Sequence, residues 1–157
     1  MPYALQPMIR IRQRREDAAG AALVVARTEE RAAAKTLEER KEELAEYERT
    51  KEERRDRVYD AVMGRPCSMD DLDKAREGVA RIDEEGALKV DNVARAEGER
   101  KKCEEATVVA RHNLAVAMKN RTKIDEHKEV WISMEAAEEE HRAEGELEDF
   151  VVRKPEI

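Results

Sequence analysis

Histidine and cysteine are the side chains of this sequence best suited to chemistry, and their spacing argues against a site. The three histidines, His112, His127 and His141, form neither the His-x-x-x-His pair nor the His–Cys spacing of zinc sites. His127 lies beside Asp125 and Glu126, which is the nearest approach to a metal-binding group. A solvated, charged helix surface explains these carboxylates better, so we predict no metal site.

Cys67 and Cys103 suggest neither a disulfide framework nor a metal site. On one continuous helix they would lie about 54 Å apart, whereas a disulfide needs Cα atoms within about 7 Å. The sequence also holds no glycine-rich phosphate loop and no plausible catalytic triad, and two helices offer no concave pocket. We therefore predict that the chain is not an enzyme and requires no cofactor.

The composition is that of long, solvated helices. Charged residues make up 44% of the 157 residues and aromatic residues 3%, and 38 acids against 31 bases give a net charge of -7. A chain of this length fits one domain, but a compact globule would need more bulky apolar residues. Disorder is the competing interpretation of such a polar chain, and the heptad periodicity described below argues against it.

One short break divides the sequence into two helical stretches. Residues 5–62 contain no proline after Pro7, and residues 69–144 contain none at all. Between them lies Gly64-Arg65-Pro66-Cys67-Ser68, and glycine followed by proline is a strong helix stop. Ser68 and Asp71 resemble a capping box that opens the second helix.

The chain is therefore predicted to be a single helical hairpin over residues 1–157. Its parts are a first helix at about 4–63, a loop at 64–68, a second helix at about 69–146 and a flexible tail at 147–157. Two long helices joined by so short a loop must fold back on each other to bury their apolar faces. The predicted fold class is all-α, a long antiparallel two-helix coiled-coil hairpin.

A heptad repeat supports this hairpin. In the second helix, alternating steps of three and four give eighteen positions, of which twelve are apolar. The eighteen are Leu72, Ala75, Val79, Ile82, Gly86, Lys89, Val93, Ala96, Arg100, Cys103, Thr107, Ala110, Leu114, Ala117, Arg121, Ile124, Lys128 and Trp131. A weaker repeat in the first helix comprises Leu23, Ala26, Ala33, Leu37, Leu44, Tyr47, Val58 and Ala61. Because alanine is common at these positions, the repeat buries little area per turn.

No segment approaches the roughly 20 apolar residues of a membrane span, and the N-terminal residues form no signal peptide. We expect a cytoplasmic protein that does not insert into a membrane. The stretch from Arg10 to Arg15 holds four arginines and indicates a docking surface for an acidic partner. Elsewhere acids are mixed among the bases, so nucleic-acid binding is not expected.

Both ends of the chain carry apolar residues that one narrow core cannot hold. The N-terminal group comprises Tyr3, Leu5, Met8, Ile9 and Ile11, and the group opposite it comprises Val130, Trp131, Ile132 and Met134. Some of them can pack together and close the open end, and the others should be exposed at a site of insertion. Beyond them, Glu135 to Asp149 is strongly acidic, with only Arg142 opposing it.

These end segments resemble the YscO family of type III secretion proteins. The start, Tyr3-Ala4-Leu5-Gln6-Pro7-Met8-Ile9-Arg10-Ile11-Arg12-Gln13-Arg14-Arg15, is similar to the family's aromatic residue, Leu-x-Pro step and basic helix. The stretch Asp125-Glu126-His127-Lys128-Glu129-Val130-Trp131 resembles a second family segment. The resemblance favours an injectisome protein over its flagellar counterpart, FliJ.

The resemblance implies a central stalk that couples the hexameric type III secretion ATPase to the cytosolic ring of the export gate. It also implies contact with secretion chaperones. The ATPase-facing residues would be Tyr3, Leu5, Met8, Ile9, Arg10, Arg12, Arg14, Arg15, His127, Lys128 and Trp131. The loop-side residues, matched by position alone, would be Leu44, Tyr47, Tyr59, Met63 and Met69. A hairpin roughly 90 Å long could bridge two stacked rings.

Three other interpretations stay open at the level of sequence. The first is a coiled-coil adaptor that binds or recycles secretion chaperones without entering the ATPase pore. The second is a scaffold that dimerises through its heptad positions, whereas a hairpin that satisfies its own core is expected to be a monomer. The third is a nucleic-acid binder, whose affinity would fall steeply with added salt.

Overall fold

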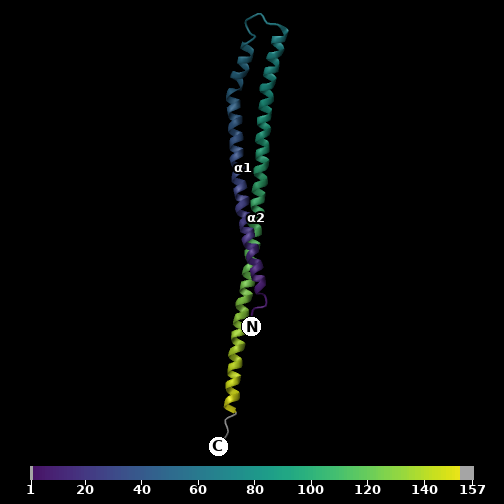
Figure 1. Cartoon of the computed structure of the whole chain (residues 1–157). Coiled ribbons are helices and arrows are strands. Elements are labelled where there is room, and N and C mark those ends of the chain that lie inside the picture. Colours follow the sequence, from purple (N-terminus) through teal and green to yellow (C-terminus); the bar gives the residue numbers. More distant parts are fainter. Residues whose placement is uncertain (1, 153–157) are drawn as a thin grey trace. The chain divides into compact units, whose positions relative to one another are not determined.

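The computed structural model describes residues 2–152, which form two long helices and no strand. Helix α1 spans Gln6–Asp60 and helix α2 spans Met69–Val152. The two helices run in opposite directions and are joined by one short loop (Figure 1). The predicted all-α antiparallel hairpin is therefore confirmed.

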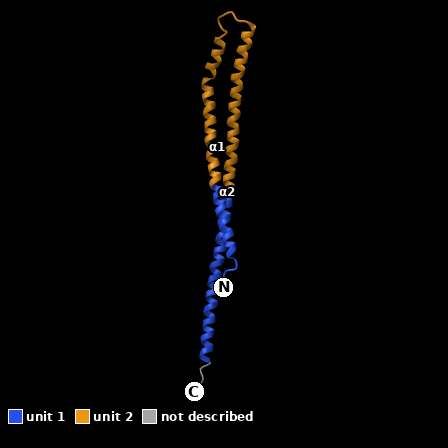
Figure 2. Ribbon diagram, viewed as in Figure 1, with its two compact units in different colours: residues 1–23, 110–157 blue, residues 24–109 orange. Residues whose placement is uncertain are grey.

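The chain divides into two compact units (Figure 2). Unit 1 comprises residues 1–23 and 110–157, and unit 2 comprises residues 24–109. In each unit a segment of α1 packs against a segment of α2, and the connecting loop belongs to unit 2. The single domain predicted from the sequence stays a prediction, and nothing in the composition marks the division into units.

Helix α1 begins two residues later than predicted, and a tight turn leads into it. The Gln6 N–H donates to the Tyr3 carbonyl at 3.1 Å, and the Met8 N–H donates to the Leu5 carbonyl at 2.9 Å. Pro7 lies in the first helical turn, where its missing N–H costs no hydrogen bond. The N-terminal residues are thereby turned toward α2.

The loop begins earlier than the sequence indicated, because the last turn of α1 tightens. The N–H groups of Val62 and Met63 both donate to the Tyr59 carbonyl, at 3.0 and 2.9 Å. Gly64 follows with a φ of 76°, a left-handed conformation that a residue without Cβ adopts at no steric cost. Ala61, predicted as a core position, is consequently exposed.

The predicted capping box opens α2. The Ser68 N–H donates to Asp71 Oδ2 at 3.1 Å, and the Asp71 N–H donates to Ser68 Oγ at 3.2 Å. At its other end α2 continues to Val152, six residues past the predicted end, since no proline interrupts the chain before Pro155. Of the predicted tail 147–157, residues 147–152 are helical and residues 153–157 lie outside the described residues.

The predicted heptad positions form the core. Only Leu72 and Arg100 are exposed among those in α2, and none is exposed within α1, since exposed Ala61 follows its last residue. Buried Thr107 is satisfied locally, because its hydroxyl donates to the Cys103 carbonyl at 3.0 Å. Both cysteines carry free thiols, and no helix of the described residues is long and apolar enough to cross a membrane.

Tyr47 and Gly86 set the register of unit 2. The Tyr47 side chain is 5% exposed, and its hydroxyl donates to the Ile82 carbonyl at 2.5 Å. A Cβ atom at residue 86 would lie 2.5 Å from the Tyr47 hydroxyl oxygen and 2.7 Å from its ring carbons. The ring therefore fits against α2 only because residue 86 has no side chain.

Replacing Gly86 with alanine should destabilise unit 2 by about 1–3 kcal/mol, since the Tyr47 ring must move and give up its hydrogen bond. The matched control is Gly98→Ala in the same helix, where nothing lies within 4 Å of the added Cβ. That change should stabilise the protein by about 0.5–1 kcal/mol. Urea unfolding followed by circular dichroism measures both, and equal effects of the same sign would contradict this account.

Stability should also depend on the cap of α2. The hydrogen bonds from Ser68 hold the pKa of Asp71 below its ordinary value, and the hydrogen bond from Arg54 does the same for Glu85. A carboxyl whose pKa is lower in the folded state than in the unfolded state stabilises the fold at pH values above its unfolded-state pKa. That stabilisation is lost as the pH falls through the folded-state pKa. The melting temperature of Asp71→Asn should therefore fall less than that of the unaltered protein between about pH 5 and pH 3. A parallel fall in both proteins would count against the cap.

Candidate partner-binding surfaces

An aromatic cluster of Tyr3, His127 and Trp131 holds the N-terminal residues against α2 in unit 1. The Tyr3 hydroxyl is hydrogen-bonded to His127 Nδ1 at 2.7 Å, and the Tyr3 and Trp131 ring centroids lie 5.3 Å apart with a 49° interplanar angle. Tyr3 is only 8% exposed. Three predicted ATPase-facing residues therefore contact one another, and Tyr3 serves to position the end rather than to present a surface.

Polar contacts fix the register of α1 and α2 next to this cluster. Arg12 Nη1 donates to the Asn120 carbonyl at 2.5 Å, a charge-assisted hydrogen bond. Arg121 is paired with Glu16 at 3.2 Å and with Asp125 at 3.5 Å. Arg12 is thus partly used within the chain, which sequence reasoning had not indicated.

The remaining arginines of the N-terminal stretch are free to meet a partner. Arg10, Arg14 and Arg15 are exposed, and no carboxylate occurs between residues 8 and 15. Leu5, Met8 and Ile11 are each about two-fifths exposed on the same helical stretch, at 41%, 41% and 44%. Ile9 and Lys128 are half-buried. Unit 1 therefore presents a mixed basic and apolar surface.

A groove in unit 1, called here the basic groove, adjoins this surface. It is lined by Arg12, Arg15, Ala19, His112, Asn113, Val116, Ala117 and Asn120. The lining combines arginine, histidine and amide side chains with small apolar ones, and it contains no carboxylate. Its α2 residues were not predicted from the sequence, and the antiparallel pairing of Arg12 with Asn120 brings them to the groove.

The loop-side set divides into buried and exposed members. Tyr47 lies in the core of unit 2 and Leu44 is half-buried, so neither forms an open surface. Tyr59, Met63 and Met69 are exposed by 42%, 70% and 68%. The physical reason is the heptad register, which turns residues 44 and 47 inward and leaves the residues beside the loop outside.

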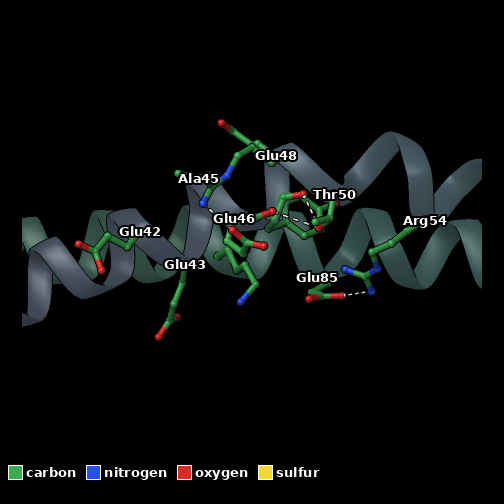
Figure 3. A pocket seen from close by; sticks show the side chains of 11 residues that line it. Glu42, Glu43, Ala45, Glu46, Glu48, Thr50, Arg54 and Glu85 are labelled. Atoms are coloured by element: carbon green, nitrogen blue, oxygen red, sulfur yellow. Dashed lines mark hydrogen bonds and ion pairs between the residues drawn. The ribbon is translucent and has the colours of Figure 1, made fainter.

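The largest groove of unit 2 lies beside Tyr47 and contains many charges (Figure 3). Glu46 is paired with Arg49 at 2.5 Å, and Glu85 is paired with Arg54 at 2.6 Å. Glu42, Glu43 and Glu48 point in different directions, as Figure 3 shows. Since these side chains do not converge on one point, they form a solvated surface rather than a reaction site.

The described residues contain no group of three or more histidines, cysteines or acids able to hold a metal ion. His127 is used in the aromatic cluster, and His141 lies 3.8 Å from Glu144 on the exposed surface of α2.

Trp131 is the only tryptophan, so its fluorescence reports on the aromatic cluster. Tyr3→Ala should expose the indole, shift its emission to longer wavelength and release the N-terminal residues. The matched control is Tyr59→Ala, which removes an exposed tyrosine in unit 2. An emission spectrum of Tyr3→Ala identical to that of the unaltered protein would show that the cluster does not form in solution.

Comparison with known proteins gives one match. The profile of the family described as "Type III secretion protein YscO" matches residues 5–153. No curated protein and no solved structure shows significant similarity to the chain.

Proposed function

Because this chain belongs to the YscO family of type III secretion proteins, we propose that it is the central stalk of the secretion apparatus. In this role it links the hexameric secretion ATPase to the cytosolic ring of the export gate, at the cytoplasmic face of the membrane. ATP hydrolysis belongs to the partner, and this chain changes its rate or its coupling to export.

The exposed arginines of unit 1 are the observation that carries the proposal. Arg10, Arg14 and Arg15 are exposed, whereas Arg12 and Tyr3 form hydrogen bonds within the chain. Arginine beside exposed apolar side chains is typical of the residues that dominate protein interfaces. A ring whose inner surface is acidic and apolar would fit this surface.

The hairpin of unit 2 suits the second half of the role. Its α1 segment runs from residue 24 to Asp60, which corresponds to about 55 Å at helical rise. The loop end carries exposed Tyr59, Met63 and Met69, and methionine adapts to irregular binding surfaces. These three residues are our proposed contacts for the export gate.

The proposal is tested by titrating the cognate ATPase with this protein and following ATP hydrolysis. We expect a rise that saturates at a single copy per hexamer. The variant Arg10→Ala with Arg14→Ala and Arg15→Ala should raise the half-saturating concentration by roughly tenfold or more, because interface arginines often contribute over 1 kcal/mol each. The variant leaves the Arg12 and Trp131 contacts intact.

The control is Arg27→Ala with Arg31→Ala, which removes exposed arginines from the same helix in unit 2. This variant should stimulate hydrolysis as the unaltered protein does. If the unaltered protein does not raise the hydrolysis rate of an ATPase shown to be hexameric, the stalk proposal is wrong and the chaperone adaptor is favoured instead.

A further inference from the structure

The last part of α2, residues 136–152, is a helix that lacks a covering partner, and we call it the C-terminal arm. Every residue in it is exposed, including Leu147 at 68% and Phe150 at 81%. A lone helix of this length is only marginally stable in water, and acids four residues apart, such as Glu140 and Glu144, repel each other. The arm should gain stability from a surface that covers it.

Charge restricts what that surface can be. The arm holds seven carboxylates against Arg142, a net charge of -6 out of -7 for the whole chain. The remainder of the chain is close to neutral, so the negative charge of this protein is concentrated on one helical segment. A covering surface must therefore be basic and must offer some apolar contact to residues such as Val151 and Val152.

The basic groove has this character. Its lining combines Arg12, Arg15 and His112 with apolar residues such as Ala19 and Val116, and it contains no carboxylate. The arm cannot reach the groove of its own chain, because the arm and the α2 residues of the groove lie on one uninterrupted helix. Asn120 and Glu144 are 24 residues apart, about 36 Å at helical rise. Only the arm of a second molecule can enter the groove.

We propose that the C-terminal arm of one copy occupies the basic groove of a second copy, and that the exchange is reciprocal about a two-fold axis. An antiparallel pair of α2 helices that sets residue 144 against residue 116 has its axis near residue 130. Val130 and Met134 are exposed by 59% and 60%, and they share a helical face with Val116. The α2 helix of the second copy would therefore cover these apolar side chains as well.

The dimer covers Arg15 and the surface around it, so it competes with any partner that uses the arginines of unit 1. It is a resting form in which the protein shields its own binding end. The sequence predicted a monomer because the heptad core is satisfied within one chain, and the dimer leaves that core untouched. The inference stands independently of the stalk proposal, since its test requires no ATPase.

The test is the mass of the full chain by analytical ultracentrifugation over a range of concentrations. We expect the mass to rise from 18.1 kDa toward twice that value with concentration. Raising sodium chloride from about 0.05 M to about 1 M should weaken the dimer at least tenfold, because salt shortens the range of these attractions. A monomer at every concentration in low salt would overturn the proposal.

Charge exchange identifies the contact. Glu144→Lys with Glu148→Lys reverses the charge at two residues of the arm and changes its net charge from -6 to -2. Arg15→Glu with His112→Glu makes two residues of the groove acidic. Each double variant alone should dimerise at least about tenfold more weakly, since every altered contact occurs twice in a two-fold interface. Mixed together, they should form a heterodimer, because an altered arm then meets an altered groove and an unaltered arm meets an unaltered groove.

The matched control is Glu42→Lys with Glu48→Lys, on exposed residues of unit 2. It changes the net charge by the same amount as the double variant of the arm. This variant should dimerise as the unaltered protein does. Recovery of the dimer on mixing also shows that both charge-reversed chains are folded. A dimer that persists in both double variants, or double variants that stay monomeric when mixed, would exclude the arm-in-groove contact.

Discussion

The packing of α1 against α2 along a narrow heptad core is the constraint on which the rest of the structure depends. Alanine fills core positions such as 26, 75 and 96, and each such contact buries little apolar area. Register must therefore be set at a few particular places. Tyr47 against Gly86 does this in unit 2, and Arg12 with the aromatic cluster does it in unit 1.

Much of the fold could be predicted because heptad spacing and helix breakers act locally. The Gly64–Ser68 break and the Ser68–Asp71 cap were readable from the sequence, as were nearly all core positions. The roles of Tyr3 and Tyr47 were not, because each depends on the residue that the other helix brings opposite. The basic groove was missed for the same reason: Arg15 and His112 lie far apart in sequence and meet only through antiparallel register.

Unit 1 carries its basic and its acidic residues on separate surfaces. The N-terminal arginines and the basic groove belong to unit 1, and so does the acidic C-terminal arm. A unit that carries both a basic groove and an acidic arm can meet partners of either charge. A partner bound to one surface then changes the affinity of the other surface for its own partner, which suits a component that has a resting and a bound state.

The shortage of large buried side chains has a thermodynamic consequence. Among the described residues no large side chain is fully buried, and much of the core is alanine. The heat capacity change of unfolding scales with the apolar surface exposed, so it should be small for a chain of this length. A small change flattens the curve of stability against temperature. Such a protein would hold a modest but nearly constant margin of stability as its surroundings warm or cool, instead of having one sharply preferred temperature.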